Sequence, residues 1–295
     1  MDSRWFSPVV VLFWVATLVW LTLDKVLPQL REGSPPTYRS LLAQDDKEPT
    51  KWDLYIDDQA VGRSESIIYR TADGGARLIG ELTLLARFPL RALIPEALSR
   101  RFLPDLQALP ARGVSIHSEA VVNRENHLLG IHVTVQWGEY ENLLKVSGIV
   151  QDNELVLTPE VLNGVKLPTM KYPISAESQL AESLSPQSRI LGLRLGQTWS
   201  IPVFSPLQPT TPVEVLQAAV AREEPIFWDG ELWNTLVVEY RGTGAAGAPQ
   251  ELRGAMWVRP DGLVLKQQAA LLTANLTFVR RSPNESDGKT SLLHD

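Results

Sequence analysis

Three consecutive segments alternate apolar and polar side chains with a period of two, and this alternation constrains the fold more than any other feature of the chain. The segments are GVSIHSEAVV, HLLGIHVTVQW and ENLLKVSGIV, separated by the turns NREN and GEY. Successive side chains of a strand point to opposite faces. Turns centred between Arg124 and Glu125, and between Gly138 and Glu139, place the apolar residues on one face. The sequence therefore predicts an antiparallel sheet with one buried face and one hydrated face.

The two faces of this predicted meander have distinct compositions. The buried face consists of Val114, Ile116, Ile131, Val133, Val135, Leu144 and Val146. The hydrated face consists of Ser115, His117, Glu119, His132, Thr134, Gln136 and Lys145. In this register His117 lies opposite His132, and two imidazoles beside a carboxylate are metal-ligand types. A solvated polar face is the simpler interpretation, and the nearby Lys145 opposes a cation, so we expect no metal site.

Short strand runs broken by turn signals continue through residues 51–281, and we count about a dozen of them. The clearest hairpin is MWVRPDGLVLKQ, in which Pro-Asp-Gly joins two alternating apolar runs. The acidic stretch AREEPIFWDGE is interpreted as turns and loop edges, although carboxylates beside aromatic residues also occur in glycoside hydrolases. The predicted fold class is mainly β, with a large antiparallel sheet or half-open barrel in residues 51–281.

The amino-terminal residues 5–23 carry no charged side chain. As a helix they span about 28 Å, close to the thickness of the hydrocarbon core of a bilayer. A cleaved signal peptide has a shorter apolar region and a small-residue cleavage site, which the following DKVLPQLREG lacks. We therefore expect a transmembrane helix in residues 1–24. The side chains assigned to this anchor are Trp5, Phe6, Val9, Leu12, Phe13, Trp14, Leu18, Trp20 and Leu23.

The orientation of this anchor rests on two opposed signals. Arg4 precedes the apolar span, whereas Lys25, Arg31 and Arg39 follow it, and this count favours a cytoplasmic carboxyl-terminal domain. A very short tail ahead of a long domain favours export, because long domains translocate largely regardless of charge. We expect a single-pass membrane protein with an extracytoplasmic domain, on the periplasmic side of the inner membrane if the source is bacterial.

Three further segments complete the predicted organisation. Residues 25–50 contain a Pro-Pro pair without a clear period and are interpreted as a juxtamembrane linker. Residues 282–295 are interpreted as a disordered tail. Residues 89–107 are predicted to form a short helical insertion, because apolar residues there recur at three- and four-residue spacing. Its candidate ligand-binding residues are Leu93, Ile94, Leu98, Phe102, Arg91, Arg100 and Arg101. The insertion would close over an apolar ligand, lie on an anionic leaflet, or simply cap the sheet.

Composition and missing motifs exclude several classes of function. The chain has no cysteine, which rules out disulfides, zinc–thiolate sites and cysteine nucleophiles. A net charge of -6 argues against nucleic acid as a partner. No G-x-S-x-G elbow, phosphate-binding loop or H-E-x-x-H motif occurs. We therefore expect no enzyme and no cofactor.

The strings LGLRLGQTWSIPVFSPL, MWVRPDGLVLKQQ and WDLYIDDQAVGRSES resemble segments of a widespread set of uncharacterised bacterial envelope proteins. These proteins carry a β-rich exported domain behind an amino-terminal membrane anchor. At the level of fold the pattern is similar to the unclosed β-barrels of lipoprotein-carrier and lipid-binding proteins, whose concave face is filled by helices. The resemblance covers most of residues 51–281 and implies no catalytic residue.

Two functions remain open from the sequence. The first is a non-catalytic binding module that holds a hydrophobic or lipid-like envelope component, and it requires a cavity of roughly 300–1,000 Å³. The alternative is a structural or assembly protein of the cell envelope that acts through protein–protein contacts and exposes an apolar patch. In both functions the anchor makes the membrane a partner. The binding module would also bind a lipid or hydrophobic ligand, and the assembly protein would also bind an envelope protein.

Overall fold

The computed structural model of the chain describes residues 13–15, 17–20, 38, 42, 48–56, 58–85, 113–138, 140–161, 164–174, 180–182, 185–205, 213–242, 251–271 and 274–282. The predicted insertion at 89–107 lies outside these residues, together with its seven candidate ligand-binding residues. Part of the predicted anchor also lies outside them, namely Trp5, Phe6, Val9, Leu12 and Leu23. Within the described residues the fold is mainly β, as predicted, and consists of a 16-stranded sheet.

We divide the sheet into two halves by chain order. The first half contains β1 (Thr50–Ile56), β2 (Gln59–Arg70), β3 (Ala76–Leu84), β4 (Val114–Val122), β5 (Leu128–Trp137), β6 (Tyr140–Gln151), β7 (Glu154–Val161), β8 (Val165–Lys166) and β9 (Met170–Pro173). The second half contains β10 (Ala181–Glu182), β11 (Thr198–Phe204), β12 (Val213–Trp228), β13 (Glu231–Gly242), β14 (Leu252–Val258), β15 (Val264–Leu271) and β16 (Ala274–Arg280).

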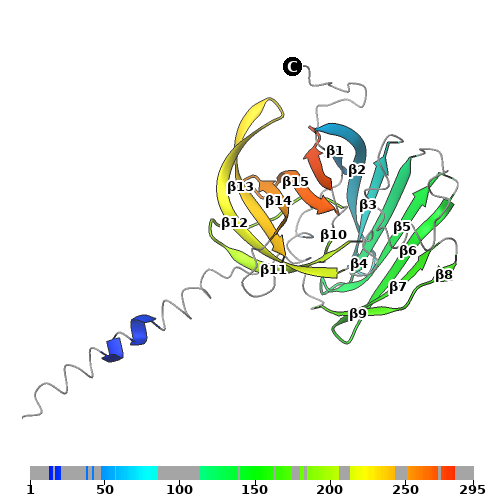
Figure 1. The fold of residues 1–295 in the computed structure, drawn as a ribbon, viewed down its shortest axis with the longest axis horizontal. Helices are drawn as coiled ribbons and strands as arrows, with labels where there is room; N and C mark the ends of the chain where they lie inside the picture. The colour runs from blue at the N-terminus through cyan, green and yellow to red at the C-terminus, as the bar shows by residue number, and fades with distance from the viewer. Residues whose placement is uncertain are drawn as a thin grey trace, which may run out of the picture.

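The sheet is open and almost wholly antiparallel. Neighbouring strands follow chain order within each half, and β1 pairs with β16 to join the halves. The β10–β11 pair is parallel, and β10 and β8 are the two end strands of the path. The prediction of a large, open antiparallel sheet is confirmed, with the halves curving away from the central strands in Figure 1. The run VKLPTMKY, predicted as one strand, forms the two short strands β8 and β9. Strand β10 was not predicted, because its two residues are too few to show an alternation.

The predicted meander forms β4, β5 and β6, and its buried face is confirmed. All seven residues assigned to that face are buried. The predicted register is wrong by two residues, because Ile116 pairs with Val135 and not with Val133. A bulge between Val121 and Val122 and an irregularity between Val135 and Trp137 displace the pairing near the turns. Since a shift of two residues returns each side chain to its own face, the segregation of the faces survives.

The Pro-Asp-Gly hairpin is confirmed as β14–β15. Gly262 has a φ of 86°, and the N–H of Arg259 donates to the carbonyl of Leu263 at 2.8 Å. The interpretation of AREEPIFWDGE as loop edges is wrong. Strand β12 continues through it to Trp228, and Asp229 and Gly230, both with positive φ, turn the chain into β13.

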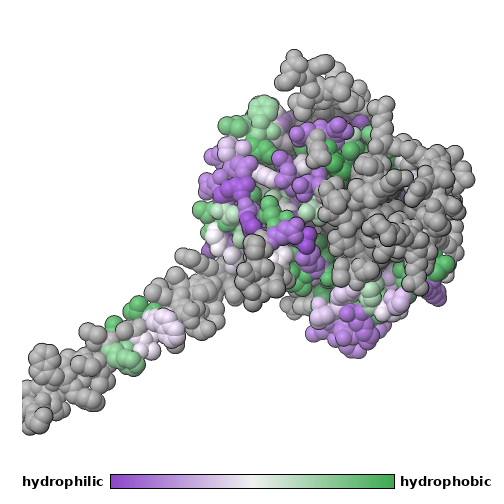
Figure 2. Space-filling view, viewed as in Figure 1, coloured by the Kyte–Doolittle hydropathy of each residue, from purple (hydrophilic) through white to green (hydrophobic). Residues whose placement is uncertain are grey.

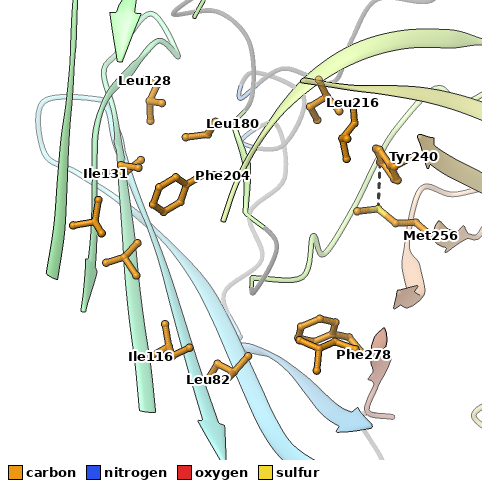
Figure 3. Close-up of a cluster of buried hydrophobic side chains, with 14 of the residues drawn as sticks. Leu82, Ile116, Leu128, Ile131, Leu180, Phe204, Leu216, Tyr240, Met256 and Phe278 are labelled. Atoms are coloured by element: carbon orange, nitrogen blue, oxygen red, sulfur yellow. Dashed lines mark hydrogen bonds between the residues drawn. The ribbon is translucent and has the colours of Figure 1, made fainter. Parts of the chain in front are cut away.

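One hydrophobic cluster joins the inner faces of both halves of the sheet. Its largest fully buried side chains include Trp52, Phe204 and Phe278, which come from β1, β11 and β16. In Figure 3 Phe204 and Leu180 point toward the strand that carries Ile131. Tyr38 and Leu42, within the segment predicted as a linker, are also buried in this cluster. The linker is therefore fastened to the domain at these two positions.

The described part of the predicted anchor is short. Residues 13–15 and 17–20 are helical, and the Thr17 hydroxyl donates to the carbonyl of Phe13 at 2.8 Å. Phe13, Trp14, Leu18 and Trp20 are all exposed. Among the residues that the structure describes, no helix has the length and apolar character needed to traverse a bilayer.

Candidate ligand-binding cavity

The inner face of β2, β3 and β4 is interrupted by a row of small residues. Ser66 pairs with Gly80, and Gly80 pairs with Ser118, so the three positions lie side by side across the strands. The next row toward the strand ends carries Ile68, Leu78 and Ala120. Since side chains of the small row project little from the sheet, they leave a hollow in an otherwise apolar face.

Residues 185–190, between β10 and β11, cover this hollow, and we call them the cover. A Cβ on Gly80 would lie 2.7 Å from the Ser118 Oγ and 2.9 Å from the Ser185 Oγ, so the cover lies directly on the small row. Leu180, just before β10, and Phe204, the last residue of β11, belong to the core. The Leu180 N–H donates to the Tyr38 hydroxyl at 3.3 Å, which ties the buried linker residue to the cover.

Hydrogen bonds from the second half of the sheet hold the cover in place. The Gln187 N–H donates to the Gln267 Oε1 at 3.1 Å. The Ser188 carbonyl accepts from the Val264 N–H and from the Arg280 Nη1, each at 3.1 Å. The Ile190 N–H donates to the Gly262 carbonyl at 2.8 Å. The first half therefore supplies the floor of the hollow, and the second half positions its roof.

The floor and the roof bound a partly open cavity of about 100 Å³. Its residues come from Tyr38, from β2 to β5, and from the cover segment with Phe204. The full lining is Tyr38, Ser66, Ile67, Ile68, Leu78, Ile79, Gly80, Ser118, Glu119, Ala120, Ile131, Val133, Leu180, Ser185, Pro186, Gln187, Ser188 and Phe204. This volume is below the roughly 300–1,000 Å³ of sites for drug-sized ligands. The cavity that the described residues bound is thus smaller than the sequence led us to expect.

Gln187 is one of the polar residues that line the cavity. Its side chain is buried, with the residue 7% exposed, and neither Nε2 nor Oε1 has a hydrogen-bond partner among the described residues. Glu119 also lines the cavity, but its carboxylate lies 2.6 Å from the Arg77 Nε on the outer face of the sheet. The cavity therefore has mainly apolar and hydroxyl-bearing walls, and the side-chain amide of the lining residue Gln187 is buried without a partner among the described residues.

The histidine pair predicted on the outer face does not form. His132 pairs with Glu119, and His117 pairs with Thr134. The His132 ring is 3.3 Å from the hydroxyls of Thr134 and Ser147, and burial, followed by the charge of Lys145, lowers its pKa. Among the described residues no cluster of three or more possible metal ligands occurs.

The carboxylates near aromatic residues form a structural network on the outer face of β12–β14. Trp257 Nε1 donates to the Glu224 Oε1 at 3.0 Å, and Arg222 bonds both Glu224 and Glu239. The bond from Trp257, followed by that from Arg222, lowers the pKa of Glu224, and the bond from Arg241 chiefly lowers that of Glu239. Both groups are held ionised, whereas a glycosidic general acid requires a raised pKa.

The sequence assigned the lining residues Ile131 and Val133 to the buried face of the sheet, but it did not single out the small row or Gln187. Ser66, Gly80 and Ser118 fall at inner positions of alternating strands, where small residues interrupt the apolar series, and this interruption is a readable signal. Gln187 carries no such signal, because its segment lacks a period and its burial depends on Gln267 and Arg280. The structure describes none of the ligand-binding residues predicted at 89–107.

These features define an open antiparallel β-sheet protein with an internal cavity between the sheet and a covering segment. A β-barrel-like protein of the domain of unknown function DUF1849, from Brucella abortus, is similar to it over 79% of this chain and 95% of that one, with 10% identity and a TM-score of 0.43. The hypothetical lipoprotein YmcC from Escherichia coli is similar over 83% of this chain and 94% of its own, with 9% identity and a TM-score of 0.27.

Likenesses at these scores do not establish a shared fold, so the function must be inferred from the chain's own geometry. No protein-family model matches the chain, and no curated protein matches it. The resemblance to membrane-anchored envelope proteins stays a prediction.

Proposed function

We propose that this protein is a membrane-anchored, extracytoplasmic binding module, without catalytic activity, that holds the apolar part of a small amphiphilic envelope component. The observation that carries the proposal is the covered cavity on the inner face. Its walls include the apolar residues Ile68, Leu78 and Ile131 and the hydroxyl-bearing residues Ser66 and Ser118. Apolar walls with few polar groups are typical of small-molecule sites.

The size of the cavity limits the ligand. A cavity of about 100 Å³ limits the ligand to a small group, such as one short alkyl chain with a small polar end. A complete phospholipid is too large for the space that the described residues bound. The proposal is thus narrower than a general lipid carrier.

The amino-terminal helix supports the membrane part of the proposal. Phe13, Trp14 and Trp20 expose between 64% and 73% of their surface. Large apolar side chains exposed together indicate contact with a membrane or a partner. Insertion into a lipid bilayer would bury these apolar side chains. It would also bring the cavity close to a source of amphiphiles.

A structural or assembly role is the second candidate, and one surface favours it. Phe227 and Leu232 pair at the tip of the β12–β13 hairpin and are 72% and 70% exposed. Figure 2 shows hydrophobic residues at this tip, beyond the hydrophilic surface of the same hairpin. The tip is a candidate contact for an envelope protein. It is much smaller than an interface of standard size.

Extraction of bound small molecules from purified full-length protein, followed by mass spectrometry, tests the proposal. Wild type should release one class of short amphiphile reproducibly. Ser66→Leu fills the cavity and should release little or none. Ser115→Leu is the matched control, because Ser115 lies on the outer face of β4 and its hydroxyl bonds Gln136. Equal yields from both variants would place any bound amphiphile outside the cavity.

A further inference from the structure

A positive charge lies beside the cavity, and it bears on the ligand provided that the cavity is a ligand site as proposed above. Arg280 follows the core residue Phe278 by two positions in β16, so both side chains lie on the inner face of the sheet. The Arg280 Nη1 donates to the carbonyl of the lining residue Ser188 at 3.1 Å, and its Nη2 donates to the Thr50 Oγ1 at 3.4 Å. The guanidinium is therefore held between the cover and strand β1.

Thr50 connects this guanidinium to the row of small residues. Thr50 is 7% exposed, and it pairs with Ser66, which lines the cavity. Directly paired side chains lie about 5 Å apart, so the positive charge lies within about 10 Å of Ser66. Arg280 does not itself line the cavity. It acts on a ligand through its electric field.

The carboxylates closest to the cavity in the described strands lie on the outer face of the sheet. Glu119 is the one carboxylate among the lining residues, and it lies 2.6 Å from the Arg77 Nε on that face. Asp53, which alternates with inner residues of β1, lies 3.5 Å from the Arg281 Nε. Both carboxylates are thus balanced by outer cations, whereas Arg189 adds a second cation to the cover.

We infer that the cavity selects short amphiphiles with an anionic end, a carboxylate or a phosphate, and that the charge of Arg280 determines this preference. The anionic end lies at the side of the cavity formed by Ser66 and Ser188, and the alkyl chain lies along Leu78 and Ile131. At roughly 10 Å, and at the effective dielectric constant of a partly buried site, one unit charge changes the affinity for an opposite charge by about tenfold. A cationic end of similar size is disfavoured by a similar factor.

Isothermal titration calorimetry of the full-length protein with octanoate, 1-octanol and octylamine at neutral pH tests the inference. The carboxylate and the amine are both ionised at this pH and carry the same apolar chain, so the ratio of their affinities reports the sign of the field in the cavity. Octanoate should bind at least about tenfold more tightly than octylamine, with 1-octanol as the uncharged reference. Octyl phosphate is titrated in parallel, and the tighter of the two anions identifies the class of ligand.

Three variants assign the preference to the charge of Arg280. Arg280→Gln should lower the ratio of octanoate affinity to octylamine affinity by at least about tenfold, whereas Arg280→Lys keeps the charge and should keep most of the ratio. A merely structural loss of the bond to Ser188 would weaken both probes alike and leave the ratio unchanged. Arg222→Gln is the matched control and should keep the wild-type ratio, because Arg222 pairs with Glu224 on the outer face of β12.

Each outcome has a separate meaning. If none of the probes binds to wild type, the proposed function is wrong and the inference falls with it. If octylamine binds as tightly as octanoate, or if Arg280→Gln keeps the wild-type ratio, the inference is wrong while the binding function stands.

Discussion

Replacing Gln187 by leucine should stabilise the protein when no ligand is present. A buried side-chain amide without a partner costs about 1–3 kcal/mol relative to an apolar group. Gln187 is 7% exposed, and both of its side-chain polar atoms lack partners among the described residues. Leucine has a similar volume and leaves the backbone N–H of residue 187 free to donate to Gln267. We therefore expect the free energy of unfolding to rise by about 1–3 kcal/mol.

Gln267→Leu is the matched variant, and the expected change has the opposite sign. Gln267 is 5% exposed, and its Oε1 accepts from the backbone N–H of Gln187 at 3.1 Å. Removing this acceptor leaves a buried N–H unpaired and should cost about 1–3 kcal/mol. The two substitutions are chemically identical and lie in contact, so general effects of hydrophobicity cannot explain opposite signs.

Urea unfolding of the full-length protein, followed by tryptophan fluorescence and circular dichroism, measures both changes. In thermal scans each kcal/mol corresponds to a shift in the melting temperature of about 2–4 °C for a domain of this size. Added 1-octanol, a short neutral amphiphile, should stabilise wild type by binding to the native state. A loss of stability in Gln187→Leu comparable to that in Gln267→Leu would mean that the amide is already paired, and would refute the reasoning.

Three further predictions concern the rest of the fold. Phe278→Ala should lower the free energy of unfolding by about 3–5 kcal/mol, because Phe278 is fully buried where β16 meets β1. Urea titration measures this loss, and a loss below about 1 kcal/mol would contradict the packing. Wild type should lose stability as the pH falls through the ordinary histidine range, since the unfolded chain protonates His132 at a higher pH than the folded protein does. His132→Gln should remove that component, and an unchanged pH profile of unfolding would oppose it. Arg222→Ala, on the exposed outer network, should cost less than about 1 kcal/mol and less still in 1 M salt; a larger, salt-independent loss would contradict an exposed network.

The alternation of side chains predicted the faces of the sheet well, because burial acts on every second residue of a strand. Ile116, Val133 and Val146 lie on the predicted inner face. The pairing between strands was less predictable, since the bulges near the turns depend on local backbone geometry that the apolar pattern does not encode. An even shift preserves the faces, so the pattern alone could not reveal it.

Turn residues predicted one hairpin correctly, but a second turn was wrongly assigned to a loop. Pro260, Asp261 and Gly262 connect β14 and β15 as predicted. Asp229 and Gly230 form an equally clear turn signal, yet the acidic residues around them led to a loop assignment. Strand β12 continues there, and Arg222 pairs with the carboxylates of Glu224 and Glu239 on its outer face.

The candidate site was the least predictable feature, because it is made by contacts between distant segments. Ser66, Gly80 and Ser118 meet only after β2, β3 and β4 have paired. Gln187 is buried only because Gln267 and Arg280, from the far end of the chain, hold its segment over the sheet. Aperiodic segments of this kind carry no sequence pattern from which burial can be inferred.

The most direct test of the central claim is nuclear magnetic resonance of the full-length protein during titration with 1-octanol. The side-chain amide signal of Gln187 is identified by its absence from Gln187→Leu. We predict that octanol shifts this signal and gives nuclear Overhauser effects to the methyl groups of Leu78 and Ile131. Effects confined to exposed side chains such as Phe227, with an unmoved Gln187 signal, would contradict a binding site in the cavity.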